Sequence, residues 1–396
     1  MYNKTMHGLG SRRSVIRELF EFGKRRAAEV GAENVFDFSL GNPNVPAPDC
    51  VREAALDIIS SEDPCAVHGY TSAQGDAGVR AAVADSLERR FGAGITPDLI
   101  YMTCGAAASL TVTLNALTEP GDEFLLLAPY FPEYAVFVSA AGATPVVVPY
   151  DEATMLPDLA AFEKALSPRV KGVIVNSPNN PSGAVYPREL LEKMCAVLRA
   201  KEKEFGHPVV LIADEPYREI VYGGAEVPFL PCLYDDTVVC YSWSKSLSLP
   251  GERIGYIALS PRLHDAAGVY AAVCGAGRAL GYVCAPSLFQ KIVARCVDAS
   301  PDIAAYESNR DLLYGALTDF GYTAVHPDGA FYLFVKALEE DANAFSDKAK
   351  ELGLLIVPGD DFGAKGWVRI SYCVSHDMIE RSLPAFKKLK AMYDAK

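Results

Sequence analysis

Residues 170–183 read VKGVIVNSPNNPSG, so that an almost wholly apolar run ends in a string of turn-forming residues. Such a run predicts a strand that is covered on both faces by helices, as in a parallel sheet. Six more short apolar segments alternate with helical segments between about residues 95 and 260, at 99–102, 123–127, 144–148, 209–213, 237–241 and 254–259. This repetition predicts an α/β fold whose large domain holds a mostly parallel, doubly wound sheet.

The pattern changes beyond about residue 297. A long helical segment, 302–318, is followed by a strand at 330–335, a helix ending near residue 352, a strand at 368–372 and a final helix. This order predicts a smaller C-terminal α+β domain. We expect residues 1–48 to be an N-terminal segment that joins the small domain, residues 49–297 to form the large domain and residues 298–396 to form the small one.

Composition excludes several classes of protein. The 396 residues carry a formal net charge of -13, which argues against binding nucleic acid or an acidic membrane surface. The basic residues gather near the N-terminus, where they alternate with apolar residues at helical spacing: Arg12, Arg13, Arg17, Lys24, Arg25 and Arg26. They are typical of the solvated face of an amphipathic helix.

No signal peptide opens the sequence, and no apolar run is long enough to cross a bilayer, so we expect a cytoplasmic protein. Its ten cysteines include no CxxC pair, which is typical of reduced thiols rather than a disulfide framework. The six histidines lack any metal-ligand spacing, and no metal site is predicted.

Four polar clusters follow predicted strands, at the edge of the sheet where α/β proteins bind ligands. They occupy residues 103–109, 176–183, 214–217 and 242–253. Each has an ordinary interpretation on its own: a helix start rich in alanine, a turn, a capped carboxylate or a surface lysine. Together they offer helix-start amides, an amide side chain, the carboxylate of Asp214, the amine of Lys245 and the guanidinium of Arg253.

This set matches the needs of pyridoxal 5'-phosphate. The cofactor's aldehyde requires an amine such as Lys245, its phosphate requires Arg253, Ser242 and helix-start amides, and its ring nitrogen requires an acid such as Asp214. A lysine becomes nucleophilic at neutral pH when burial or a neighbouring cation lowers its pKa.

The chain resembles the class I/II aminotransferases, which are fold type I pyridoxal-phosphate enzymes, over nearly its whole length. The resemblance rests on motifs in a fixed order: 39–43 (SLGNP), 70–71 (YT), 179–183 (NNPSG), 214–217 (DEPY), 242–245 (SWSK), 253–255 (RIG), 329–332 (GAFY), 357–359 (VPG), 362–363 (FG) and 368–371 (VRIS).

The resemblance implies a role for each matching residue. Lys245 would form the Schiff base, Asp214 would pair with the pyridine nitrogen, and Asn180 and Tyr217 would bind the phenolic oxygen. Phe131 would stack on the ring. The phosphate would be held by Ser242, Arg253 and the amides of Ala106, Ala107 and Ala108, with Tyr70 reaching over from a second subunit. Arg369 would bind the substrate α-carboxylate with help from Asn180 and Gly41. A homodimer follows from the role of Tyr70.

Two residues depart from the family pattern. Ala106–Ala108 offers no hydroxyl, whereas many relatives carry serine or threonine there, so one side-chain bond to phosphate is missing. Phe131 replaces a tryptophan or tyrosine, although a phenyl ring still stacks.

The substrates and one rival reaction stay open. An aspartate-type enzyme would need a second cation such as Arg278, whose ordinary interpretation is a charge at a helix end. The aromatic side chains of Tyr70, Phe131, Tyr134 and Tyr332 would instead favour aromatic substrates. A β-eliminating carbon-sulfur lyase could use the same lysine, aspartate and arginine. A cofactor-sensing DNA-binding regulator is disfavoured because only about forty residues precede Gly41.

Overall fold

The computed structural model describes residues 1–11 and 15–395. Arg12 and Arg13 of the predicted amphipathic helix lie outside these residues. The helix itself is confirmed from Val15 onward, because α2 (Val15–Val30) buries Leu19 and exposes Lys24 and Arg25. No helix in the described ranges combines the length and the apolar character needed to cross a membrane.

The larger of the two main sheets has seven strands, in the order β2-β8-β7-β6-β5-β3-β4. Only β8 runs antiparallel to its neighbours, and the other strand pairs are parallel. The strands are β2 (Ile100–Thr103), β3 (Glu123–Leu127), β4 (Thr144–Val148), β5 (Val170–Asn176), β6 (Val210–Asp214), β7 (Thr237–Ser242) and β8 (Gly255–Leu259). The predicted mostly parallel sheet is confirmed.

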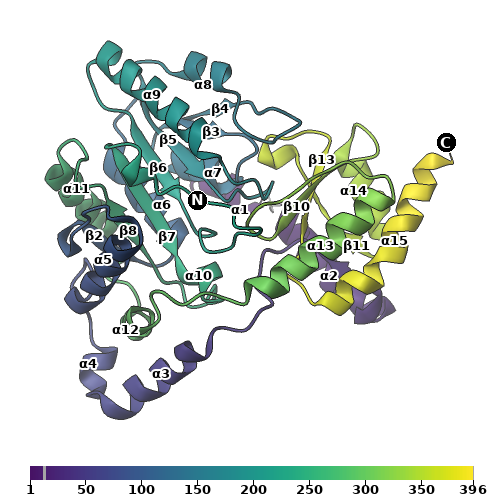
Figure 1. Cartoon of the computed structure of the whole chain (residues 1–396), viewed down its shortest axis with the longest axis horizontal. Helices are drawn as coiled ribbons and strands as arrows, with labels where there is room; N and C mark the ends of the chain where they lie inside the picture. Colours follow the sequence, from purple (N-terminus) through teal and green to yellow (C-terminus); the bar gives the residue numbers. More distant parts are fainter. Residues whose placement is uncertain (12–14, 396) are drawn as a thin grey trace.

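Helices cover both faces of this sheet (Figure 1). In β6, Leu211 and Ala213 join one apolar core, while Val210 and Ile212 join another on the opposite face. Both faces are therefore buried, which explains why the strands are apolar at nearly every position. The helices are α3 (Asp49–Ser61), α4 (Pro64–His68), α5 (Ala77–Phe91), α6 (Ala106–Leu117), α7 (Glu133–Ala140), α8 (Leu159–Ala165), α9 (Arg188–Phe205), α10 (Trp243–Ser246), α11 (Ala266–Ala279) and α12 (Ser287–Arg295).

A four-stranded antiparallel sheet, in the order β12-β13-β10-β9, lies beside the first and has its own apolar core. Its strands are β9 (Ala324–Val325), β10 (Tyr332–Lys336), β12 (Val357–Pro358) and β13 (Trp367–Ser371), and its helices are α13 (Ile303–Asp319), α14 (Ala342–Glu351) and α15 (His376–Asp394). Helix α1 (Lys4–Ser11) precedes α2 at the N-terminus.

The N-terminal part of the chain joins this second sheet region rather than the first. Strand β1 (Phe36–Asp37) pairs in parallel with β11 (Leu354–Leu355), about 320 residues later in the chain. The chain then crosses to α3, so that residues 38–48 run along the space between the two sheets.

Predicted and observed element ends differ by one or two residues, for local reasons. The long helix begins at Ile303 because Asp302 is its N-cap, accepting a hydrogen bond from the backbone N-H of Ala305. Strand β10 begins at Tyr332 rather than residue 330, because Ala330 has a positive φ of 55° that no strand residue adopts.

Candidate active site

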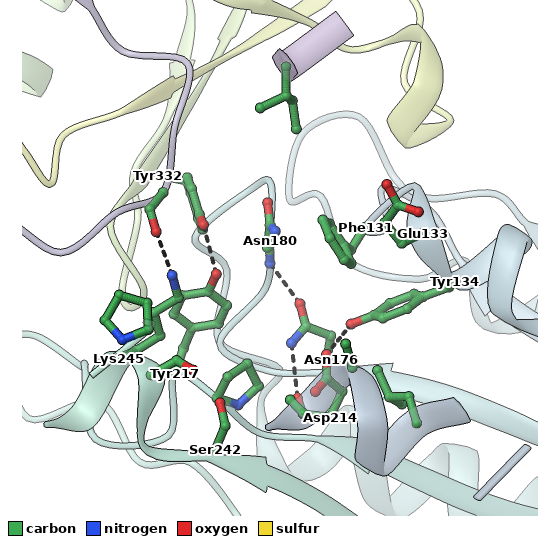
Figure 2. A pocket seen from close by; sticks show the side chains of 18 of the residues that line it. Phe131, Glu133, Tyr134, Asn176, Asn180, Asp214, Tyr217, Ser242, Lys245 and Tyr332 are labelled. Atoms are coloured by element: carbon green, nitrogen blue, oxygen red, sulfur yellow. Dashed lines mark hydrogen bonds between the residues drawn. The ribbon is translucent and has the colours of Figure 1, made fainter. Parts of the chain in front are cut away.

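A cavity of about 370 Å³ opens at the carboxyl ends of the parallel strands, between the two sheets (Figure 2). Strands β5, β6 and β7 each end in a residue that lines it, as expected for a doubly wound sheet. Most of the site residues predicted from the sequence lie in its wall: Gly41, Ala106, Phe131, Asn180, Asp214, Tyr217, Ser242, Lys245, Arg253, Arg369 and Ala107.

Lys245 lies in α10, a single helical turn that follows β7 directly. Its Nζ donates a hydrogen bond to the carbonyl oxygen of Gly41. Burial, together with the positive charges of Arg369 and Arg253, lowers the pKa of Lys245 to about 8. An amine with this pKa is partly neutral near pH 7, and can act as a nucleophile or a base.

Asp214 is the last residue of β6, and its side chain is buried in the cavity wall. Tyr134 donates a hydrogen bond to Oδ2, and the side chain of Asn176 donates to the backbone oxygen at 2.9 Å. Among the described residues, Oδ1 has no partner. Burial raises the pKa of Asp214 to about 7, and the bond from Tyr134 opposes this rise. The unpaired oxygen suits an N-H donor on a ligand.

An anion-binding corner lies where α6 begins. Gly105, the residue before α6, has a φ of 88°, and a Cβ there would lie 2.6 Å from Nη2 of Arg253. No described side chain caps this helix start, so its first backbone amides have no side-chain acceptor, and the guanidinium of Arg253 lies beside Gly105. Helix-start amides next to an arginine attract phosphate. Ser242 is buried in the same wall, whereas Ala108 is buried and does not line the cavity.

Arg369 is a buried cation at the other end of the cavity, 2% exposed. Its Nη1 donates to Oδ1 of Asn180 at 3.0 Å and its Nη2 to the backbone oxygen of Ser39 at 2.6 Å. Nε has no hydrogen-bond partner within the described part of the chain. Burial lowers the pKa of Arg369. Because a guanidinium has five N-H groups, several remain for a carboxylate.

Tyr217 and Tyr332 meet between these two ends (Figure 2). Their hydroxyl oxygens are 2.7 Å apart, and both side chains are buried. A Cβ on Gly41 would lie 2.1 Å from the Tyr332 hydroxyl, so only glycine fits at that position. Tyr134 and Tyr332, expected to favour aromatic substrates, therefore have hydroxyls committed to other site residues.

The structure brings in contacts and residues that the sequence did not predict. Tyr134 follows Phe131 by one helical turn and packs edge-on against its ring, with 5.7 Å between centroids. Glu133, together with Ile16 and Arg17 of α2, lines the outer part of the cavity. The sequence named Tyr134 only as an aromatic side chain that could favour aromatic substrates, and no local pattern connected Ile16 or Arg17 with the rest of the cavity wall.

Two predicted residues lie outside the cavity of their own subunit. Tyr70 is 91% exposed on a segment after α4, and Arg278 is exposed in the last turn of α11. Neither lines the pocket. A role for either one therefore requires a second copy of the chain.

Comparison with known proteins identifies the relatives of this chain. The family model described as aminotransferase class I and II matches residues 33–386. An aspartate/prephenate aminotransferase from Thermus thermophilus is 32% identical over 361 residues, which cover 89% of this chain and 90% of that protein. An aromatic-amino-acid aminotransferase from Thermococcus litoralis is 28% identical and covers 95% of each chain.

A crystal structure of an amino transferase from Eubacterium rectale superimposes with a TM-score of 0.98 at 57% identity, over 100% of this chain and 99% of that one. This likeness agrees with the fold predicted from the sequence. These relatives are all named as aminotransferases, and nothing among them favours the carbon-sulfur lyase.

The cavity fits pyridoxal 5'-phosphate, the cofactor of these relatives. The unpaired Oδ1 of Asp214 suits a protonated ring nitrogen, and the corner beside Gly105, which a Cβ would fill, suits a phosphate. An amine of lowered pKa, Lys245, lines the same cavity.

Proposed function

The chain belongs to the class I and II aminotransferases, and from that premise we propose how its residues divide the work of the reaction. It is a pyridoxal-phosphate-dependent enzyme that moves an amino group between an amino acid and a 2-oxo acid. When bound, the cofactor supplies an aldehyde carbon that takes the amino group and a pyridine ring that spreads the charge left on the α-carbon.

The cofactor ring is held from three sides. Asp214 keeps the ring nitrogen protonated through Oδ1, and Tyr217 and Asn180 donate to the phenolic oxygen. Oδ1 of Asn180 already accepts from Arg369, which directs its amide N-H groups the other way. Phe131 stacks on the ring face.

The phosphate is held by Arg253, Ser242 and the amides of Ala106, Ala107 and Ala108. Tyr70 of the partner subunit completes this group. Because the three alanines offer no hydroxyl, Arg253 and the backbone amides carry more of the phosphate binding than side chains do.

Lys245 carries the proton of the reaction. Its Nζ would bind the aldehyde carbon of the cofactor, and as a free amine it would accept the proton from the substrate α-carbon. A pKa of about 8 supports this, since the neutral amine and the ammonium are then both populated near neutral pH, as general acid-base catalysis requires.

Arg369 binds the substrate α-carboxylate, assisted by Asn180 and the backbone at Gly41. The free N-H groups of the guanidinium form a bidentate pair with the two carboxylate oxygens. The distal side chain of the substrate then extends toward Phe131, Ile16 and Arg17. We propose aspartate-type or aromatic substrates, the classes acted on by the Thermus and Thermococcus relatives according to their names.

Two further assignments are part of the proposal. The enzyme is a homodimer in which Tyr70 and, for dicarboxylates, Arg278 act in the partner's cavity; exposure of Tyr70 supports this. All ten cysteines are unpaired, which supports a reducing, cytoplasmic location. The domain limits are residues 1–48 with 298–396 for the small domain and 49–297 for the large one.

One observation carries the proposal: an amine of lowered pKa and an unpaired buried carboxylate oxygen line one cavity. Borohydride treatment of the holoenzyme should attach a pyridoxyl group to Lys245, detected by peptide mass, and Lys245→Ala should abolish both labelling and transamination. Lys193→Ala, which removes an exposed lysine paired with Glu189, is the control. Normal turnover by Lys245→Ala, or an unlabelled native enzyme, contradicts the proposal.

A panel of amino acids tests the substrate class. Loss of the cofactor's visible band on mixing with each amino acid reports the half-reaction without a coupling enzyme. Strong reaction with aspartate that persists in Arg278→Ala removes the dicarboxylate role of Arg278. Release of pyruvate and ammonia from cystathionine without an acceptor acid would instead restore the lyase.

A further inference from the structure

We propose that Tyr332 is a positioning residue for both ends of the site. Its hydroxyl sets the direction in which Tyr217 donates its proton, and its ring holds the guanidinium of Arg369 in place. The inference rests on the proposed function, because it assigns Tyr217 to the cofactor and Arg369 to the substrate.

The hydroxyl oxygens of Tyr217 and Tyr332 are 2.7 Å apart and form a hydrogen bond. Burial raises the pKa of Tyr332 to about 12 and that of Tyr217 well above 10, so both phenols stay neutral at working pH. Each has a single proton, and only one of the two protons can lie between the oxygens. If Tyr332 donates, the proton of Tyr217 is directed into the cavity.

Packing against Gly41 keeps the Tyr332 hydroxyl in this position. The distance from its oxygen to a Cβ on Gly41 would be only 2.1 Å, so the hydroxyl lies directly against the glycine backbone and cannot swing toward it. The carbonyl of the same glycine accepts from Lys245. The hydroxyl pair and the lysine amine are therefore held by one short segment of backbone.

The ring of Tyr332 lies against the buried guanidinium of Arg369. The guanidinium carbon of Arg369 lies 4.7 Å from the ring centroid of Tyr332 and 5.1 Å from that of Phe362. Aromatic faces stabilise a cation by their quadrupole, and more strongly when water is excluded. They also restrict the plane of the guanidinium, so that its donors stay aimed at Asn180 and at the cavity.

Sheet register explains why one residue reaches both groups. Tyr332 is opposite Ser371, and Phe334 is opposite Arg369, in the antiparallel pair β10 and β13. Since side chains alternate across a strand, Tyr332 and Arg369 project from the same face as diagonal neighbours. Tyr217 reaches the same face from the loop after β6 and packs edge-on against the Tyr332 ring, 5.6 Å between centroids.

The two contributions are separated by two substitutions. Tyr332→Phe removes the hydroxyl and keeps the ring, whereas Tyr332→Leu removes both. We expect Tyr332→Phe to lower kcat about 5- to 10-fold, the value of one hydrogen bond, and to leave the amino-acid KM within about 2-fold, since the cation still faces a ring. Tyr332→Leu should in addition raise KM about 5- to 20-fold.

A spectroscopic readout tests the hydroxyl independently of turnover. A donor to the phenolic oxygen of the cofactor favours its ionised form. A Tyr217 hydroxyl that loses the hydrogen bond donated by Tyr332 is a weaker and less fixed donor, so the pH midpoint of the holoenzyme's visible absorption should move upward. Tyr332→Phe and Tyr217→Phe should both move it upward, and the double variant should move it no further than Tyr217→Phe alone. In contrast, the KM increase of Tyr332→Leu should persist when Tyr217→Phe is also present, because the ring acts through Arg369.

The outcomes are distinct. If wild type takes up no pyridoxal phosphate and shows no visible band, the proposed function fails. If wild type binds pyridoxal phosphate and shows the visible band, but Tyr332→Phe titrates like wild type, the inference alone is overturned. The same conclusion follows if Tyr332→Phe and Tyr332→Leu raise KM equally. A folding defect in Tyr332→Phe is excluded when its cofactor affinity, measured by fluorescence, and its thermal midpoint equal those of wild type. Tyr332→Phe decides the role of the hydroxyl even if Tyr332→Leu does not fold.

Discussion

Replacing Lys245 by methionine should make the cofactor-free enzyme more stable at neutral pH. The native lysine is a charge held in a cavity wall, where burial lowers its pKa from the ordinary value of 10.5 to about 8. That difference measures how much the folded protein disfavours the ammonium. Methionine has a similar length and no charge, so it removes the cost while filling the same space.

The size of the effect follows from the two pKa values. Their difference, at about 1.4 kcal/mol for each pKa unit, corresponds to about 3 kcal/mol. Losing the hydrogen bond from Nζ to Gly41 costs about 1 kcal/mol, which leaves a net gain of about 2 kcal/mol at pH 7.

The gain should depend on pH in a defined direction. Below pH 8 the lysine is protonated in both the folded and the unfolded chain, so the full cost of burying the charge is present. Between pH 8 and 10.5 the unfolded chain binds more protons than the folded one, and wild-type stability rises with pH. Above about pH 10.5 the gain is gone, and the variant should be less stable by about 1 kcal/mol.

Urea unfolding of the cofactor-free proteins at pH 7 and pH 10, at one protein concentration, measures this difference. Arg369→Met is the matched control, since it removes a buried charge that does not titrate in this range. Its effect should be equal at both pH values. A Lys245→Met variant that is no more stable than wild type at pH 7, or whose gain is unchanged at pH 10, would refute the reasoning.

Three other substitutions test the surroundings of the site. Tyr134→Phe removes the donor to Asp214 and should raise the pKa of that carboxyl further above about 7, weakening cofactor binding about 10-fold at pH 7.5 by fluorescence titration; unchanged affinity would contradict this. Gly105→Ala places a methyl group 2.6 Å from Arg253 on a backbone with φ of 88°, and should weaken binding of the phosphate cofactor but not of pyridoxal, which lacks the phosphate. Glu215→Gln leaves its arginine partner as an unpaired buried charge and should destabilise the fold by about 3 kcal/mol in urea, whereas a change below 1 kcal/mol would exclude that role for the pair.

The large sheet and much of its site could be predicted from the sequence because both depend on local pattern. Apolar runs identified the strands, and a parallel sheet collects the residues that follow them at one edge. Asp214 and Ser242 lie there because each is the last residue of a strand, and the loop containing Asn180 lies there because it follows one. The residue types alone indicated a carboxylate, a hydroxyl and an amide at this edge, before any distance was known.

Other parts of the site depend on contacts between distant segments. The bond from Tyr134 to Asp214 joins residues 80 apart, and the Tyr332 hydroxyl meets one 115 residues earlier. The sequence named both tyrosines as aromatic side chains, but no local pattern indicated the partners of their hydroxyl groups. Helix α2 reaches the cavity only through tertiary packing, so no local signal could place Ile16 or Arg17 there.

The pairing of β1 with β11 determines when the N-terminal part of the chain can fold during synthesis. Phe36 and Asp37 cannot pair until Leu354 and Leu355 have been synthesised. Asp37 and Leu355 are 318 residues apart in the chain. At about 5–20 residues per second, a ribosome needs roughly 15 to 60 s to supply the partner strand. The segment that contacts both Lys245 and Arg369 follows β1 directly. The pocket is thus completed last, after the large sheet has emerged, and a nascent chain stopped before residue 354 should hold a folded sheet without a finished active site.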